Sequence, residues 1–291
     1  MSHVYPTLAY LQWDINRVLF EVGPIKIRYY GLFFTAGFIC GYLLLRWIFR
    51  TEKRNLDDVE SLLIYMVLGT IIGARLGHCL FYHPMEYLSD PIRLLQIWNG
   101  GLASHGAAVG ITLSAWLYSR KHRDQPLLWL LDRLAIPVAL AGFFIRIGNF
   151  FNSEILGRAS DVPWAVVFKD GLGLSPEQKL VPRHPVMLYE SLCYGFIFVL
   201  LLLIYRKYKE RTPRGLLIGL FFITVFTARF VLEFFKLRQA AFAENLPLSV
   251  GQMLSIPLVI AGIVFLLYRR PAPPLEEEVA LQTPREPAAK A

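Results

Sequence analysis

The chain has 291 residues, of which 55% are hydrophobic and 18% are charged, and its formal net charge is +8. Several apolar runs reach or approach the roughly 20 residues that a helix needs to cross a bilayer, which excludes a soluble protein. A membrane barrel is excluded because its strands would alternate in polarity. The basic residues gather between the apolar runs, where membrane topology explains them better than nucleic-acid binding does. The three cysteines lie inside apolar runs without paired spacing, so we expect neither a disulfide nor a metal site.

The first 28 residues lack the basic start, apolar core and small-residue cleavage site of a secretory signal peptide. They mix apolar residues with Asp14, Arg17 and Glu21. This mixture predicts a short amphipathic or irregular segment at the membrane surface. A turn is expected at Gly23 and Pro24.

Seven apolar runs follow and predict an all-α, polytopic membrane protein. The approximate bounds of the predicted spans are 29–49, 62–81, 102–118, 127–145, 186–205, 215–235 and 250–268. The polar segment 151–185 separates the fourth and fifth spans, and we expect it to form a small head. Residues 1–270 are therefore expected to form one integral membrane domain, and the Pro-, Glu- and Ala-rich tail 271–291 is expected to be disordered.

Strongly basic clusters follow the first, third, fifth and seventh spans. By the positive-inside rule these clusters lie in the cytoplasm. The amino terminus is therefore expected outside the membrane and the carboxyl terminus inside.

The predicted topology converts residue numbers into depths at about 1.5 Å per helical residue. Arg75 and Arg229 then lie in the outer halves of their spans and Arg146 near the outer rim, while Tyr30 and His105 lie a few residues inside the outer face. A single buried arginine often only snorkels or pairs with a carboxylate. Five polar residues from five spans at one depth indicate a binding site instead.

The most polar stretch at a span end is RIGNFFNSEILGR, residues 146–158. Polar groups at this depth are costly unless something binds them, so we interpret the stretch as a cradle for a lipid phosphate. Arg146 and Asn149 share a helical face if the helix continues that far. Arg229 and Glu233, four residues apart, also share a face, so the carboxylate can orient the guanidinium. The planar donor fork of arginine suits a phosphodiester better than lysine does.

His105 lies in the sequence GGLASHG, where the flanking glycines let another chain or a substrate come close. A histidine with a pKa near 6.5 takes a proton at neutral pH. A histidine that only packs between helices is the alternative. The motif RHPVMLYE, residues 183–190, is interpreted as mostly structural, because its proline suits the first turn of a helix.

These motifs together resemble those of the bacterial prolipoprotein diacylglyceryl transferases, in order and over nearly the whole chain up to Arg270. They are RYYGL (28–32), GARLG (73–77), WNGGLASHG (98–106), RIGNFFNSEILGR (146–158), RHPVMLYE (183–190), ARFVLEFF (228–235) and GQMLSIP (251–257). The resemblance implies a multi-pass protein of the bacterial inner membrane whose active site faces the periplasmic leaflet.

The activity implied by the resemblance is transfer of the diacylglyceryl group from phosphatidylglycerol to the lipobox cysteine of a preprolipoprotein. A thioether forms and glycerol 1-phosphate leaves. The implied partners are phosphatidylglycerol, preprolipoprotein signal peptides and membrane lipids, and no cofactor is needed. The catalytic residues matched by motif are His105, Arg146 and Arg229. The expected substrate-binding residues are Arg146, Tyr30, Asn149, Glu154, Gly157 and Glu233, also matched by motif, together with Asn152 and Arg75.

The sequence departs from the family pattern at four positions. Val225 stands where Tyr is frequent, Ser153 and Ala107 where Gly is usual, and Asn99 where an acidic residue is frequent. The main alternative function is a transporter or flippase for an anionic lipid or small anion. Transporters place their sites near the midplane between internal repeats, whereas the charges here crowd the outer half and no repeat is visible. A membrane scaffold, the second alternative, leaves the shared depth of the arginines without a cause.

Overall fold

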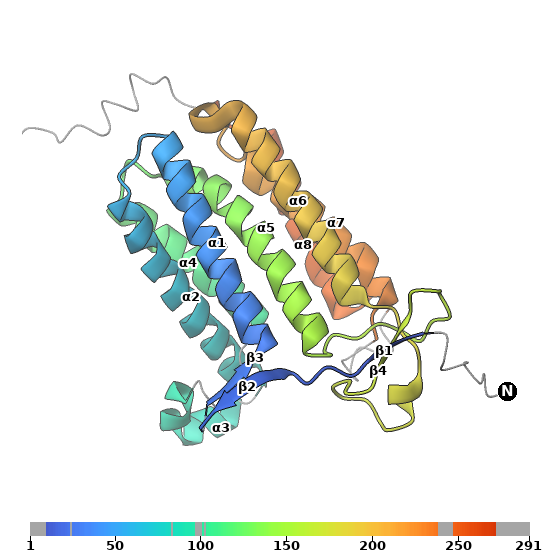
Figure 1. Cartoon of the computed structure of the whole chain (residues 1–291). Coiled ribbons are helices and arrows are strands. Elements are labelled where there is room, and N and C mark those ends of the chain that lie inside the picture. Colours follow the sequence, from blue (N-terminus) through green and yellow to red (C-terminus); the bar gives the residue numbers. More distant parts are fainter. Residues whose placement is uncertain are drawn as a thin grey trace, which may run out of the picture. The chain divides into compact units, whose positions relative to one another are not determined.

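The structure of the chain is a computed structural model that describes residues 10–23, 25–82, 84–96, 101, 103–237 and 247–271. Figure 1 shows the helices and strands of the chain. The chain divides into two compact units. The first unit comprises the described parts of Met1–Leu44, Leu134–Tyr208 and Gly215–Arg269, and the second those of Leu45–Arg133, Lys209–Arg214 and Arg270–Ala291. The tail predicted to be disordered, 271–291, and Asn99 lie outside the described residues, except for Pro271.

Seven long helices correspond to the seven predicted spans. They are α1 (Tyr29–Thr51), α2 (Asp57–Tyr82), α4 (Ser104–Lys121), α5 (Leu127–Phe151), α6 (Val186–Tyr208), α7 (Leu216–Leu232) and α8 (Val250–Leu267). Six of them are long and apolar enough to cross a membrane. The remaining helix, α4, has 18 residues and is less apolar because it contains His, Ser and Gly residues and ends in Arg-Lys. The prediction of an all-α, multi-pass membrane protein is therefore confirmed, while the orientation of the termini stays a prediction.

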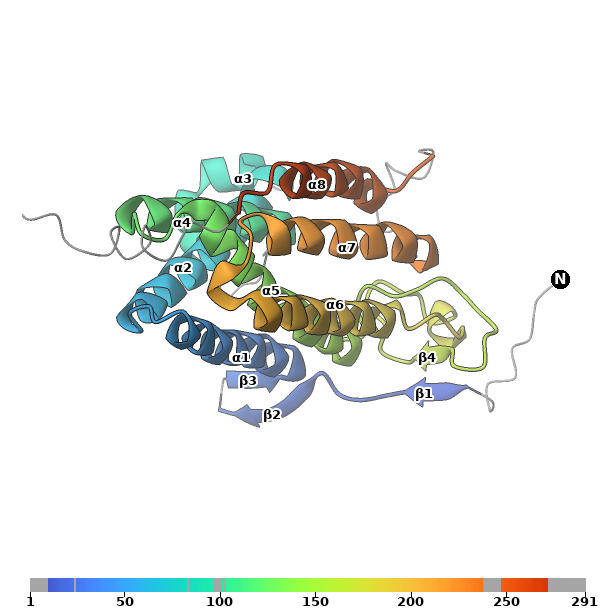
Figure 2. The same ribbon diagram turned by 90° about the horizontal axis from the view of Figure 1, so that it is seen from above.

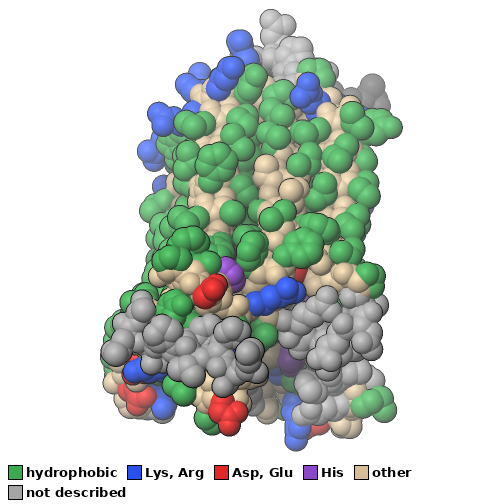
Figure 3. All heavy atoms as spheres, turned by 90° about the vertical axis from the view of Figure 1, so that its right-hand side faces the viewer, with side chains coloured by type: hydrophobic (Ala, Val, Ile, Leu, Met, Phe, Trp, Pro, Cys, Tyr) green, Lys and Arg blue, Asp and Glu red, His purple; other side chains and the backbone are tan. Residues whose placement is uncertain are grey.

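Exposed apolar side chains support the membrane assignment. Leu192 and Phe196 of α6 are 71% and 70% exposed. Soluble proteins rarely expose large apolar patches to water. Hydrophobic side chains cover most of the helical surface in Figure 3, and Lys and Arg side chains gather at one end of it. Such a surface is solvated by lipid tails rather than by water.

In the first unit, α5 packs closely against two neighbours through small residues. A Cβ atom added at Gly37 of α1 would lie 3.3 Å from the Cα atom of Ala141, and one added at Gly142 would lie 2.9 Å from the ring of Tyr194 on α6. Helix α7 packs against both α6 and α8, and Figure 2 shows these three helices side by side. Close backbone approach of this kind drives helix association in membranes, where no hydrophobic effect operates between helices.

The second unit is built on the pair α2 and α4. A Cβ atom added at Gly110 would lie 2.1 Å from the carbonyl oxygen of Gly69, and one added at Gly106 would lie 2.3 Å from the carbonyl oxygen of Gly73. The two helices therefore touch backbone to backbone, as in other small-xxx-small contacts. The short helices α3 (Pro84–Ser89) and η1 (Pro91–Leu95) connect α2 to the loop before α4.

The amino-terminal segment forms strands, so its prediction as a short amphipathic or irregular piece is wrong in conformation. Strands β2 (Val18–Val22) and β3 (Ile25–Arg28) pair antiparallel, and Gly23 between them has φ of 59° in the predicted turn. The run VLFEV is rich in the branched and aromatic residues that favour strands. Strand β1 (Leu11–Trp13) pairs in parallel with β4 (Val166–Phe168), which lies in the segment after α5.

The segment after α5 has an apolar core of its own. Its fully or nearly buried members come from the end of α5, the loop after it, β4 and the start of α6: Phe150, Leu156, Val166, Phe168 and Met187. Trp13 of β1 packs against this core, with its ring centroid 4.2 Å from that of Phe150. The core holds the loop after α5 against the start of α6. Two further 3₁₀ turns, η3 (Gln178–Leu180) and η4 (Lys209–Arg211), complete the described connections around α6.

Candidate functional site

The last turn of α5 carries a chain of polar contacts. Helix α5 continues to Phe151, so Arg146 and Asn149 do lie on one face, and Arg146 Nη1 donates to Asn149 Oδ1 at 3.0 Å. Asn149 is 4% exposed and its amide donates to Glu154 Oε1 at 2.6 Å. The structure thus connects three of the site residues expected from the sequence.

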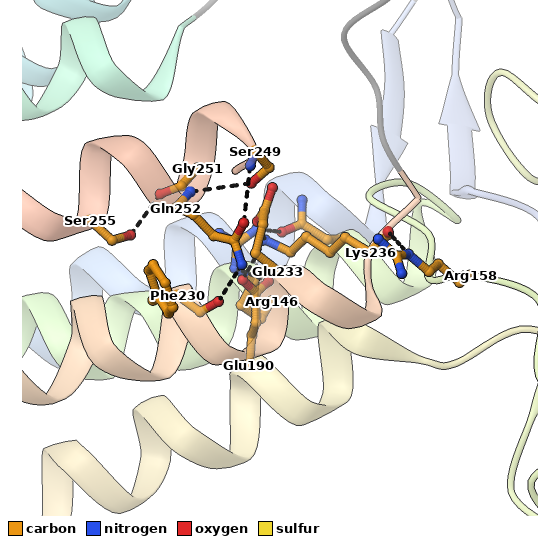
Figure 4. Close-up of polar contacts among 11 residues, drawn as sticks. Arg146, Arg158, Glu190, Phe230, Glu233, Lys236, Ser249, Gly251, Gln252 and Ser255 are labelled. Carbon is orange, nitrogen blue, oxygen red and sulfur yellow. Dashed lines mark hydrogen bonds and ion pairs between the residues drawn. The ribbon is translucent and has the colours of Figure 1, made fainter. Parts of the chain in front are cut away.

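A buried carboxylate on α6 links this chain to the end of α7. The Glu190 side chain is 0% exposed, and its Oε2 atom lies 2.9 Å from Arg146 Nε. Its Oε1 atom lies 2.8 Å from Lys236 Nζ, and Lys236 in turn lies 3.1 Å from Glu233 Oε2 (Figure 4). Cations and anions therefore alternate across the ends of three helices. A buried network of this kind is tolerated only because each charge has a counter-charge.

Glu233 pairs with Lys236 rather than with Arg229, which differs from the predicted i, i+4 pair. Helix α7 ends at Leu232, and Glu233 opens a 3₁₀ turn, η5 (Glu233–Phe235). Residues three apart eclipse one another in a 3₁₀ turn, so Glu233 and Lys236 face the same way. Arg229, in the last turn of α7, is half-buried and makes no side-chain hydrogen bond or ion pair with another described residue, although its charge acts on Glu190.

Tyr30, near the start of α1, belongs to the same neighbourhood. A Cβ atom added at Gly148 would lie 3.1 Å from the Tyr30 ring, so the glycine lets the ring lie against α5. Tyr30 interacts electrostatically with Glu154 and Arg146. The phenol is therefore held beside the polar chain on α5.

The loop after α5 contains a strained residue and two buried polar atoms without a hydrogen-bond partner among the described residues. Ser153 has φ of 50°, in the left-handed region that glycine prefers. The buried atoms Asn152 Oδ1 and Ser153 Oγ have no hydrogen-bond partner among the described residues. Among the described residues, no side-chain hydrogen bond joins Asn152 to Asn149 or Glu154.

Gly157 is needed for close packing of three segments. A Cβ atom there would lie 2.3 Å from the carbonyl oxygen of His184, and Gly157 also forms an antiparallel bridge with Lys236. The next residue, Arg158, donates from its backbone to Phe235 O at 2.8 Å and from Nε to Lys236 O at 3.1 Å. These bonds fasten the loop after α5 to the segment that carries Lys236.

A small pocket opens where these segments meet the start of α8. Residues from the loop, η5 and the first turn of α8 line it: Arg158, Glu233, Phe234, Lys236, Leu237, Pro247, Ser249 and Gln252. The lining combines two cations, the Glu233 carboxylate and hydroxyl and amide groups, which suits a small polar ligand. Several of these side chains converge in Figure 4.

His184 forms a separate contact chain just before α6. Its Nδ1 atom lies 3.2 Å from the Tyr189 hydroxyl, which accepts a hydrogen bond from Trp164 Nε1 at 2.6 Å. Because indole nitrogen only donates, the Tyr189 proton is available to His184 Nδ1. Burial lowers the pKa of His184 below its usual value near 6.5, and Asp161 acts weakly in the opposite direction. The motif RHPVMLYE, residues 183–190, therefore borders the site, because its last residue is Glu190.

Arg75 and His105 belong to the second unit. Arg75 is 4% exposed and donates to the carbonyl oxygens of Leu94, Arg93 and Gly101, so it fastens the connection between α2 and α4. His105 is the second residue of α4 and is exposed, with its ring edge-on to Phe81 at 5.3 Å. These hydrogen bonds of Arg75 thus all go to backbone carbonyl groups of the second unit.

Sequence reasoning did not select Glu190 or Lys236 as site residues. Glu190 follows a helix start that was interpreted as structural, and Lys236 lies beyond the predicted end of the sixth span. The i, i+3 spacing of Glu233 and Lys236 was the available signal. No group of three or more His, Cys, Asp or Glu residues that could hold a metal ion occurs in the described part of the chain, and its three cysteines are free.

Comparison with known proteins gives one consistent result. Residues 17–268 match the family model described as prolipoprotein diacylglyceryl transferase. A phosphatidylglycerol–prolipoprotein diacylglyceryl transferase of Chloroherpeton thalassium is 49% identical over 260 residues, which are 89% of this chain and 94% of the relative. The enzyme with this name from Tolumonas auensis is 49% identical over 88% of this chain and 96% of its own length. That from Porphyromonas gingivalis is 39% identical over 94% of this chain and 99% of its own length.

Proposed function

This chain belongs to the prolipoprotein diacylglyceryl transferase family, and on this premise we propose that it transfers the diacylglyceryl group of phosphatidylglycerol to the lipobox cysteine of preprolipoproteins. The names of the relatives state both substrates, phosphatidylglycerol and prolipoprotein. Neither the family match nor these relatives supports the alternative of an anion transporter.

The observation that best supports the proposal is the state of Arg229. Its guanidinium is half-buried at the end of α7, next to the pairs formed by Arg146, Glu190 and Lys236, yet no described side chain pairs with it. A half-buried guanidinium that forms no ion pair or hydrogen bond with a described side chain favours the binding of a ligand anion. The phosphodiester of phosphatidylglycerol supplies such an anion, and the planar fork binds it through two oxygens.

The chemistry of the reaction requires this kind of anion binding. The cysteine thiolate attacks the glycerol carbon of the diacylglyceryl group, the bond from that carbon to the phosphate oxygen breaks, and a phosphate monoester leaves. Negative charge accumulates on the departing phosphate. Preorganised guanidinium groups, away from bulk water, stabilise that charge where it develops. In this proposal Arg229 and Arg146 bind the phosphate, while Asn149, Glu154 and Tyr30 fix the orientation of Arg146 and of the headgroup.

The attacking thiol has an ordinary pKa near 8.5 and must lose its proton. His105 is assigned the role of base or of headgroup-positioning residue by its match to the family histidine. A base within reach contributes roughly 10² to 10⁴ in rate. Asn152, Gly157, Glu233 and Arg75 complete the proposed set, with Gly157 and Arg75 acting through the backbone segments they hold.

We place the active site on the outer side of a bacterial inner membrane. The basic clusters after the first, third, fifth and seventh spans set this orientation through the positive-inside rule. The amino terminus and the segment 151–185 are then periplasmic, and the carboxyl terminus is cytoplasmic. Cysteine accessibility to a membrane-impermeant reagent, measured with single cysteines introduced at Ser175 and at Lys207, tests this orientation. Labelling at Lys207 in intact cells would refute it.

The activity is tested with purified protein, labelled phosphatidylglycerol and a lipobox peptide. We expect peptide lipidation and release of glycerol phosphate in equal amounts. Arg146→Ala and Arg229→Ala are expected to abolish both. The matched control is Arg120→Lys, because this guanidinium lies over Trp116 in the second unit and is expected to leave turnover unchanged.

Two outcomes would contradict the proposal. Absence of both products with folded wild-type protein would refute the activity. Near-normal turnover of Arg146→Lys or Arg229→Lys would refute phosphate binding through a bidentate guanidinium, since an ammonium group offers no planar fork.

A further inference from the structure

The motif GQMLSIP, residues 251–257, has no part in the mechanism described so far, yet it opens α8 beside the charge network. Ser249 caps the helix: its hydroxyl oxygen accepts from Gln252 N at 3.2 Å, and its own backbone N–H donates to Gln252 Oε1 at 3.0 Å. This reciprocal capping box fixes the conformation of the first turn. Ser255 Oγ donates to Gly251 O at 2.7 Å within the same turn.

Gln252 also attaches this first turn to α7. Its side chain is only 3% exposed, and Nε2 donates to Phe230 O, one residue after Arg229, at 3.4 Å. The oxygen of the Gln252 amide therefore accepts a hydrogen bond from the cap, and its nitrogen donates one to α7. The position of the start of α8 relative to the end of α7 is fixed by side chains of the motif itself.

Gly251 lies directly against the carboxylate of Glu233. A Cβ atom added at Gly251 would lie 2.8 Å from the Glu233 carboxyl carbon and from Oε1, and 2.9 Å from Oε2. All three atoms of the carboxylate thus occupy the space that any other residue at this position would fill. Figure 4 shows Glu233 beside the first turn of α8.

The first turn of a helix suits a carboxylate. The backbone N–H groups there lack partners inside the helix, and the helix dipole adds a partial positive charge. Glu233 additionally pairs with Lys236 at 3.1 Å. The Lys236 ion pair satisfies the Glu233 charge without Arg229, although Arg229 lies four residues earlier in the chain.

We propose that Gly251 is a positioning residue for phospholipid binding, because it lets Glu233 rest on the first turn of α8 and so keeps Glu233 from neutralising Arg229. The inference rests on the proposed function. A side chain at position 251 displaces the carboxylate, and the nearest alternative cation on the same segment is Arg229. The substitution therefore moves a negative charge into competition with the lipid phosphate rather than removing a charge.

The test is Gly251→Ala in the transfer assay, with the KM for phosphatidylglycerol and kcat measured separately. We expect KM to rise about tenfold, within the range of couplings between neighbouring charged groups, with a smaller change in kcat. Thermal stability should be retained, because the displaced atoms are the far end of a flexible side chain. The double variant Gly251→Ala/Glu233→Asp should recover a lower KM than the two single effects predict, since aspartate is one methylene shorter.

The matched control is Gly262→Ala on the same helix. A Cβ atom there would lie 2.8 Å from the carbonyl oxygen of Gly219, so the change strains the backbone contact between α7 and α8. It is expected to lower thermal stability and to leave the KM of the folded fraction unchanged. This pattern is the reverse of that expected for Gly251→Ala.

The outcomes separate the two proposals. Wild-type protein without diacylglyceryl transfer would overturn the proposed function. Active wild-type protein together with an unchanged KM in Gly251→Ala, or with no recovery in the double variant, would overturn the role of Gly251 alone.

Discussion

The Glu190 carboxylate lies 2.9 Å from the guanidinium of Arg146, and its side chain has no exposed surface. The same carboxylate lies 2.8 Å from the ammonium group of Lys236. One anion near the start of α6 therefore holds two cations, one from α5 and one from the segment after α7. The orientation of Arg146 depends on a residue that need not touch the substrate.

Glu190→Gln is expected to destabilise the protein by about 3–5 kcal/mol, because Arg146 loses its counter-charge and Lys236 loses one of its two carboxylate partners. The free energy of unfolding in detergent measures this loss. The control is Glu21→Gln, since Glu21 pairs with Lys26 on the exposed surface of the β2–β3 hairpin and contributes little. Equal stability of the two variants would contradict the view that Glu190 organises the cluster.

Gly110→Ala is expected to force α2 and α4 apart, because the added Cβ atom would lie 2.1 Å from a backbone oxygen that cannot rotate away. Overpacking of this kind costs roughly 1–3 kcal/mol, seen as a lower melting temperature. Gly31→Ala on α1 is the matched control, since nothing lies within 4 Å of its added Cβ atom. A melting temperature for Gly110→Ala equal to that of Gly31→Ala would disprove the backbone contact.

Ser153→Gly is expected to stabilise the protein by about 1 kcal/mol, because an L-residue in the left-handed region carries a strain that glycine lacks. The substitution also removes a buried hydroxyl that has no partner among the described residues. Thermal unfolding measures the gain. Ser160→Gly provides the contrast, since the Ser160 hydroxyl accepts from Val162 N at 3.3 Å and its loss should lower stability.

The pH dependence of stability contains a contribution from His184. Burial lowers its pKa below the usual value near 6.5, so the unfolded chain takes up the proton first as the pH falls. This contribution is present above about pH 6.5 and is lost progressively below it. His184→Gln should therefore show a flatter decline between neutral and acidic pH than the wild type.

Tyr189→Phe serves as the control for this pH experiment, because it removes the hydroxyl contact at 3.2 Å and keeps the histidine. Its stability should still decline below about pH 6.5. An identical pH profile for wild type and His184→Gln would show that this histidine does not titrate between the folded and unfolded states.

The helices were predictable because length and polarity set them. Apolar runs bounded by basic residues located α1, α2 and α5 to α8, and the predicted starts at Tyr29, Leu127, Val186 and Val250 coincide with the helix starts. The strands were missed for two reasons. The β2–β3 hairpin is short and half polar, so its strand propensity competed with an amphipathic interpretation. The pairing of β1 with β4 joins distant segments, and no local pattern signals it.

The sequence predicted the cationic residues of the site better than the ion pairs that they form. The spacing of Arg146 and Asn149 led to a contact that the structure contains at 3.0 Å. The expected pairing of Glu233 with Arg229 failed because η5 replaces the last α-helical turn, which turns Glu233 toward Lys236. Glu190 was missed as a site residue since its partners lie on other helices, where sequence spacing carries no information.

The parallel pairing of Leu11 with Val166 bears on how the protein is made. At roughly 5–20 residues per second, the ribosome needs on the order of 8 to 30 s to synthesise the intervening polypeptide. During that interval β1 has no partner strand, because the four long helices α1, α2, α4 and α5 are synthesised before β4. The β1–β4 pair therefore forms late, after the segment that follows α5 has been synthesised, and a chain arrested before that point carries an unpaired strand edge.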